Sequence, residues 1–156
     1  MAINTQKVIV GGVAAGVVVG AVDYVVNGIL LAEQNEAALN ALNPDLAANM
    51  EGGAFIAIGI VLTLGFGILI AWTYALLRPR YGAGAKTAVF AALQLWCVIT
   101  LIFAGMSFAG MFTWSYFALG SVIAAVELLI GTNVAGYLYS EEMTPGEHDE
   151  PNSVGA

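Results

Sequence analysis

Residues 54–77 read AFIAIGIVLTLGFGILIAWTYALL, a run of 24 residues with no charged side chain and no proline. An α-helix rises about 1.5 Å per residue, so this run would form a helix roughly 36 Å long. The hydrocarbon core of a bilayer is about 30 Å thick, and about 20 apolar residues cross it. The run therefore predicts a helix that spans a membrane with some tilt.

Three further stretches, 8–31, 87–110 and 116–139, have the same length and are nearly as apolar. Strands of a membrane barrel would be about 10 residues long and would alternate in polarity, and these stretches do not alternate. We therefore expect an all-α fold, an integral membrane four-helix bundle within residues 1–140. The last residues, 141–156, combine prolines with five acidic residues, and we expect a disordered acidic tail there.

The composition favours lipid as the surrounding solvent. Of the 156 residues, 60% are hydrophobic and 10% are charged, and the mean hydropathy is +0.85. Soluble domains carry about 25% charged residues, so this chain has too few polar side chains to cover a water-exposed surface. With four basic residues in the whole chain, no patch can neutralise a phosphate backbone, which argues against nucleic-acid binding. The expected partner is the lipid bilayer.

The few basic residues predict how the bundle is oriented. Lys7 precedes the first apolar stretch. Arg78, Arg80 and Lys86 form a basic loop between the second and third stretches. Because basic loops stay on the cytoplasmic side of a membrane, both termini are expected in the cytoplasm. The basic loop is expected to act as this orientation signal, and binding of anionic lipid head groups is the alternative.

The longest connection covers residues 32–53 and has four acidic residues and no basic one. Asn43 can cap a helix that begins at Pro44. We expect the first helix to continue past the membrane surface and to turn near Asn43. A short helix around 44–50 would then lead back into the membrane.

Small residues recur at helical spacing within the apolar stretches. Glycines every four residues let a neighbouring backbone approach closely, because no side chain holds the two helices apart. The candidate helix-packing positions are Gly12, Gly16, Gly20, Gly59, Gly67 and Gly131. They predict either packing within one bundle or a seam between copies in a homo-oligomer or a larger membrane complex.

Two acidic residues, Asp23 and Glu127, fall within the apolar stretches, which have no Lys, Arg or His to pair with them. A charge at the centre of a bilayer costs roughly 2.5 to 3.5 kcal/mol on insertion scales. Either the two acids are protonated and donate hydrogen bonds between helices, or they line a wet cavity and bind a proton or a cation. Asn27 and Gln94 are candidate polar neighbours, and the similar depth of the two acids allows a shared site.

Residues that would support enzymatic chemistry are scarce. The one histidine, His148, lies in the acidic tail, and Cys97 is the one cysteine. This excludes haem held by two histidines of one chain, a Cys/His metal cluster and a nucleophile–histidine pair within the bundle. We therefore predict no catalytic residue, no metal site and no cofactor, and a function other than that of an enzyme.

Two short patterns carry a family resemblance. Asp23…Asn27-Gly28 lies in the first stretch, and Arg78-Pro79-Arg80-Tyr81-Gly82…Lys86-Thr87-Ala88 lies between the second and third. Over residues 7–139 the chain resembles a group of small four-span bacterial membrane proteins that have no assigned activity. The resemblance implies a multi-pass protein of the bacterial inner membrane.

Two functions are compatible with these features. The first is a structural or accessory membrane component, in which the small residues and neutral acids serve packing and assembly. The alternative is an oligomeric small transporter or channel that depends on a proton or a cation and uses Asp23 and Glu127.

Overall fold

The computed structural model describes residues 3–43, 45, 50 and 52–139. Within these residues the chain is helical, with five α-helices and one π-helical segment and no strand. The helices are α1 (Thr5–Asp23), η1 (Tyr24–Leu30), α2 (Ala32–Leu42), α4 (Gly53–Tyr81), α5 (Ala85–Phe108) and α6 (Trp114–Leu138). The short helix expected around 44–50 and the tail over 141–156 lie wholly or mostly outside the described residues.

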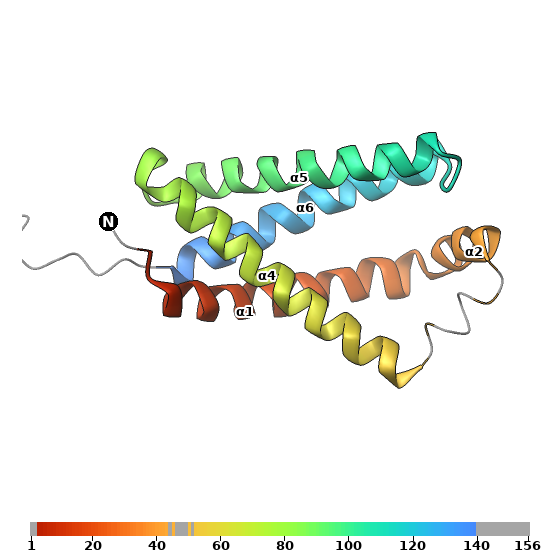
Figure 1. The fold of residues 1–156 in the computed structure, drawn as a ribbon, viewed down its shortest axis with the longest axis horizontal. Coiled ribbons are helices and arrows are strands. Elements are labelled where there is room, and N and C mark those ends of the chain that lie inside the picture. Colours follow the sequence, from red (N-terminus) through yellow and green to blue (C-terminus); the bar gives the residue numbers. More distant parts are fainter. Residues whose placement is uncertain (1–2, 44, 46–49, 51, 140–156) are drawn as a thin grey trace, which may run out of the picture.

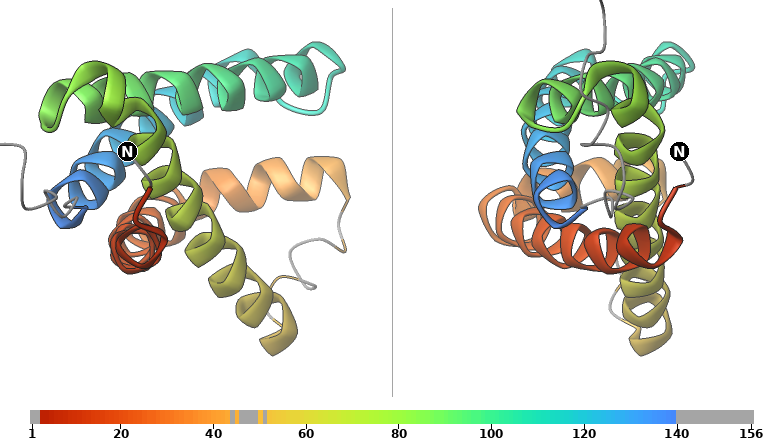
Figure 2. Two further views of the ribbon diagram at one scale, coloured as in Figure 1. Left: turned by 60° about the vertical axis from the view of Figure 1, so that its left-hand side comes forward. Right: turned by 90° about the vertical axis from the view of Figure 1, so that its left-hand side faces the viewer.

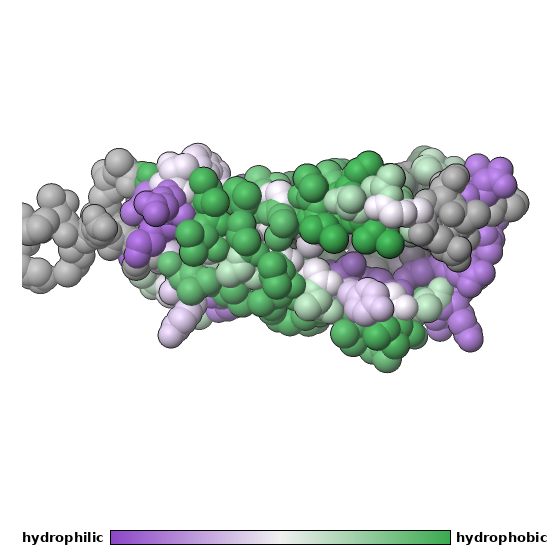
Figure 3. All heavy atoms as spheres, turned by 90° about the horizontal axis from the view of Figure 1, so that it is seen from below, coloured by the Kyte–Doolittle hydropathy of each residue, from purple (hydrophilic) through white to green (hydrophobic). Residues whose placement is uncertain are grey.

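Four helical segments are long and apolar enough to cross a membrane: Thr5–Leu30, Gly53–Tyr81, Ala85–Phe108 and Trp114–Leu138. This confirms the expectation of an all-α chain with four membrane-length helices. Large apolar side chains cover the outside of the bundle, among them Leu101, which is 74% exposed, and Phe108, which is 86% exposed. Figure 3 shows this apolar surface between two more hydrophilic ends.

The bundle is built on one hairpin and one close crossing. α5 and α6 run antiparallel and side by side, and α4 crosses α1 at an angle (Figures 1 and 2). α6 also packs against α1 and α4. The buried core lies where these helices meet, and its side chains include Val8, Ala15, Ile70, Tyr74 and Leu128.

The turn between α4 and α5 is shorter than the sequence suggested. Arg78 and Arg80 do not lie on a loop, because α4 continues through them and through Pro79 to Tyr81. Basic side chains in the last turn of a helix interact favourably with its negative C-terminal end. Lys86 likewise lies in the first turn of α5. The turn itself is 82–84, where Gly82 (φ 83°) and Gly84 (φ 121°) have backbone angles that favour glycine.

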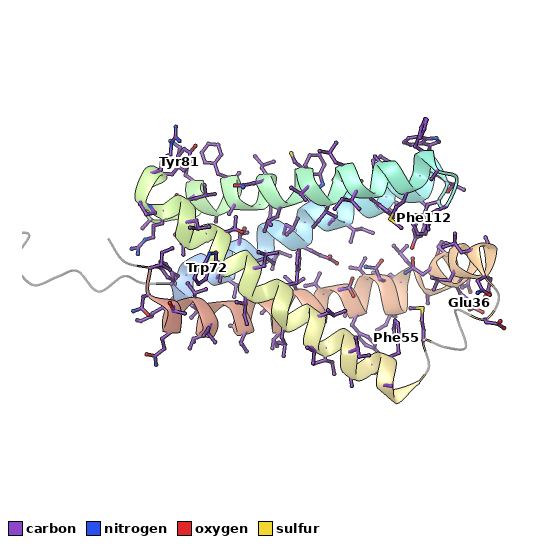
Figure 4. The ribbon with its side chains drawn as sticks, viewed as in Figure 1. Glu36, Phe55, Trp72, Tyr81 and Phe112 are labelled. Atoms are coloured by element: carbon purple, nitrogen blue, oxygen red, sulfur yellow. The ribbon has the colours of Figure 1, made fainter. Side chains whose placement is uncertain are left out.

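The two ends of the bundle differ in charge. The start of α1, the α4–α5 turn and the end of α6 lie together at one end, and α2 and the α5–α6 turn lie at the other (Figure 1). All four basic residues are on elements of the first end. The acidic residues Glu33 and Glu36 are on α2 at the opposite end, and Figure 4 labels Glu36 there.

The first helix changes its form before it leaves the bundle. Its last turns are π-helical, and the Leu31 N–H donates to the carbonyl of Val26, five residues earlier, at 2.9 Å. At Leu31 the helix breaks, and α2 then runs across the end of the bundle (Figures 1 and 2). α2 ends at Leu42, and the side-chain oxygen of the next residue, Asn43, accepts a hydrogen bond from the Asp45 N–H at 2.9 Å. This is the bond that a capping Asn43 would make.

Candidate functional site

The main cavity has a volume of about 1000 Å³ and lies between the first helix, α2 and the first half of α4, with Tyr116 of α6 at its edge. It forms because α4 touches α1 near the middle of the bundle and then diverges from it (Figures 1 and 2). Figure 3 shows a hollow on the face seen from below, with hydrophilic residues inside it and an apolar surface along part of its rim. Both the crossing and the divergence therefore shape this site.

Glycine backbones make the crossing between α1 and α4. A Cβ atom added to Gly12 would lie 2.5 Å from Ile68 Cα, and one added to Gly67 would lie 2.5 Å from Gly16 Cα. At Gly16 itself, an added Cβ would be 2.9 Å from the Thr63 carbonyl oxygen. Real side chains do not tolerate such distances, so these glycines are required for the two helices to approach.

The other candidate packing glycines have different surroundings. A Cβ at Gly20 would lie 3.0 Å from Thr63 Cγ2, and one at Gly131 would lie 2.7 Å from Val19 Cγ2. Gly59 has no atom within 4 Å of its added Cβ and lines the cavity. The structure thus places Gly59 away from any helix contact, because α4 has already separated from α1 at that height.

A chain of side-chain hydrogen bonds runs along one wall of the cavity. The Tyr116 hydroxyl donates to Asn35 Oδ1 at 2.8 Å. Asn35 Nδ2 donates to the Asn27 carbonyl oxygen, also at 2.8 Å. Asn27 Nδ2 then donates to Asp23 Oδ1 at 2.8 Å. This network joins α6, α2, η1 and α1, and all four of its residues line the cavity.

Only half of this network was identified from the sequence. Asp23 and Asn27 were candidates because they are polar residues in an apolar stretch. Asn35 lies in a polar segment, where an asparagine is unremarkable, and Tyr116 is one of several aromatic residues near a helix end. Their contact joins positions 81 residues apart, and it depends on α2 folding across the bundle, which hydropathy does not predict.

Glu127 lies on α6 and is partly buried. Its Oε1 atom is buried and has no hydrogen-bond partner among the described residues. Glu127 does not line the cavity. A buried carboxylate oxygen without a partner is costly, so a proton or a bound cation would stabilise this position.

Gln94 is exposed on α5 and does not line the main cavity. A second, smaller cavity of about 440 Å³ lies between α2 and the start of α6, with Phe112 of the α5–α6 turn in its wall. Figure 4 shows Phe112 at that end of the bundle. Within the described part of the chain, no three His, Cys, Asp or Glu residues come together as a metal site.

No family model, no curated protein and no solved structure matches this chain. The features that bear on function are the geometry of the cavity and the acids Asp23 and Glu127.

Proposed function

We propose that this chain is a small multi-pass transporter of the bacterial inner membrane that binds a cation at Asp23 and exchanges it with protons at Asp23 and Glu127. The observation that carries the proposal is the position of Asp23. Its carboxyl group lies in the wall of a cavity of about 1000 Å³ whose lining is otherwise mostly apolar. Intramembrane acids of this kind mark ion pathways and proton relays in membrane proteins.

The chemistry of the cavity favours a positively charged ligand. Asp23 Oδ1 receives a hydrogen bond from the neutral Asn27 amide, which orients the carboxyl group without neutralising it. The basic residues belong to the opposite end of the bundle. In surroundings of low polarity, an unneutralised carboxylate attracts a cation far more strongly than it does in water.

Glu127 would serve as the second proton-binding group. Its Oε1 atom is buried and has no hydrogen-bond partner among the described residues. If both acids were ionised they would oppose each other, because like charges repel. Cation binding at Asp23 and proton release from Glu127 would then influence one another. No catalytic step and no cofactor is involved.

The distribution of charge supports an orientation with both termini in the cytoplasm. The positive-inside rule assigns the end with Lys7, Arg78, Arg80 and Lys86 to the cytoplasm. The cavity and the acidic α2 would then face the outer side. α2 has one apolar and one polar face, as helices that lie flat in a membrane interface do.

Proton flux in reconstituted vesicles tests the proposal. Vesicles with wild-type protein should release protons when a cation gradient is imposed, and Asp23→Asn and Glu127→Gln should reduce this flux to the level of empty vesicles. The matched control is Glu33→Gln, which removes an exposed acid on α2 and should keep the wild-type flux. Background flux from correctly folded wild-type protein would overturn the proposal.

A structural or accessory role is the second candidate function. It is favoured by the close contact of Gly12, Gly16 and Gly67, which makes a rigid crossing, and by the first turns of α4, where Phe55, Ile56 and Ile58 are exposed. This glycine contact lies within one chain, so assembly into a homo-oligomer or a larger complex would use other surfaces. Under this role, Gly16→Ile should destabilise the isolated chain while any oligomer size in detergent stays unchanged.

A further inference from the structure

We propose that the cavity binds an amphipathic organic monocation, a bulky apolar body with one delocalised or substituted cationic centre, rather than a bare metal ion. This inference rests on the proposed function and specifies its substrate class. It is carried by the volume of the cavity, the distribution of polar groups on its walls and the charge of the side chains that line it.

The volume is far larger than a single ion needs. Pockets for drug-sized molecules have volumes of about 300 to 1,000 Å³, and this cavity has about 1000 Å³. Hard cations such as Ca²⁺ are held by about 6 to 8 oxygen atoms at short distance. Among the described residues, Asp23 is the one acidic residue in the cavity lining, and no metal-binding cluster is found.

The walls have opposite character. One wall carries the hydrogen-bonded side chains of Asp23, Asn27 and Asn35. The facing wall is the first half of α4, with Phe55 and Ile60. Figure 4 shows Phe55 on α4 at the side that faces the first helix. A ligand that fits both walls has a charged part and an apolar part.

Aromatic rings and the one carboxylate among the described lining residues favour a positively charged ligand. Tyr24, Phe55 and Tyr116 line the cavity with Asp23. Ring faces attract cations, and the attraction is strongest when the cation is poorly hydrated. An anion would meet the carboxylate of Asp23 without a compensating base. A lipid acyl chain would fill the apolar part but would leave that carboxylate beside hydrocarbon, which is costly.

The polar network explains how a small protein can hold such a ligand. Tyr116 and Asn35 tie α2 to α6 at the edge of the cavity, so the polar wall keeps its position while the α4 wall is apolar and open. The hollow in Figure 3 adjoins the apolar surface of the bundle on one side. An amphipathic cation that partitions into the membrane would reach Asp23 from that side.

Binding of two hydrophobic ions with the same shape and opposite charge tests this inference. Tetraphenylphosphonium and tetraphenylborate are compared by isothermal titration calorimetry with the purified full-length protein in detergent. The phosphonium should bind at one site per chain and the borate should not. Asp23→Asn should weaken phosphonium binding by about tenfold or more, and NaCl or KCl at the same concentration should not compete.

Two tryptophan variants separate the cavity from the general apolar surface. Ile60→Trp fills the cavity and should abolish phosphonium binding. Its neighbour Val61 is 68% exposed and is outside the cavity lining, so Val61→Trp should bind as wild type does. Circular dichroism of both variants shows whether the helical fold is kept, and the Asp23→Asn result tests the site if Ile60→Trp does not fold.

Each other outcome overturns either the organic-cation inference or the transport function, in a distinct way. Equal binding of both ions, or equal binding to wild type and Asp23→Asn, would show that the apolar surface takes up any hydrophobic ion. If a neutral short-chain lipid were the only compound that displaced the phosphonium, the cavity would be assigned to lipid. Absence of phosphonium binding together with Na⁺- or K⁺-driven, Asp23-dependent proton flux would overturn the organic cation and leave the transport function standing. Asp23-dependent phosphonium binding without any flux would overturn the transport function and leave the organic cation as the ligand.

Discussion

Single residues decide whether α1 and α4 meet. Gly67 is the most constrained of them, because a side chain there would enter the backbone of Gly12 and Gly16. The sequence predicted the small-residue ridge, since glycines at a spacing of four are visible in one helix alone. It did not show that Gly59 lines the cavity and lies outside the α1–α4 contact, because the crossing angle depends on both helices.

Gly67→Ala should destabilise the folded protein because the added methyl group has no room. Overpacking of a buried contact typically costs about 1 to 3 kcal/mol. The measurement is the free energy of unfolding in mixed detergent and dodecyl sulfate micelles. Gly65→Ala is the matched control: it lies on the same helix with open space around its Cβ, and it should not destabilise the protein, because alanine is the better helix former. Equal effects of the two substitutions would contradict the close crossing.

Asp23 and Asn27 illustrate what a sequence reveals about a polar site. Their spacing of four places them on one face of a helix, and they do form a direct hydrogen bond. The partners Asn35 and Tyr116 belong to other elements, and tertiary folding alone brings them to the same wall. Glu127 was identified for the same reason as Asp23, yet the structure keeps it outside that wall.

At the scale of elements, the joint between the first helix and α2 is the feature that hydropathy missed. A π-helical segment is rare and often marks a functional site. Here it covers Tyr24–Leu30 and positions Asn27 and Tyr24 at the cavity.

The boundaries of α4 and α5 were missed for a different reason. Pro79 and two arginines suggested a loop, but a proline and basic side chains are tolerated near this helix end.

Tyr116→Phe tests whether α2 is held across the bundle by this one bond. Losing the hydrogen bond to Asn35 should cost about 1 kcal/mol, which corresponds to roughly fivefold faster amide exchange in residues 32–42. The measurement is hydrogen–deuterium exchange of the protein in detergent. Tyr137→Phe is the control, because Tyr137 is 89% exposed on α6 and its loss should leave exchange in α2 unchanged. Unchanged exchange in Tyr116→Phe would show that other contacts hold α2.

At the scale of the whole molecule, the sequence predicted the number and character of the long helices well. Their apolar length and the grouping of the basic residues are properties of the chain itself and need no tertiary information. The cavity could not be predicted, because it arises from the angle between α4 and α1 and from α2 lying across the end. Those features depend on how side chains pack between elements distant in sequence.

The transport proposal places these helices across a membrane, with the cavity on its outer side. Labelling of single cysteines in a Cys97→Ser background tests this most directly, using a membrane-impermeant maleimide on intact bacterial spheroplasts. Glu36→Cys on α2 should be labelled in intact spheroplasts, and Ala85→Cys at the start of α5 should be labelled only after the membrane is permeabilised; both positions are exposed in the folded chain. Labelling of Ala85→Cys in intact spheroplasts, with Glu36→Cys protected, would contradict the proposed orientation and place Asp23 on the cytoplasmic side.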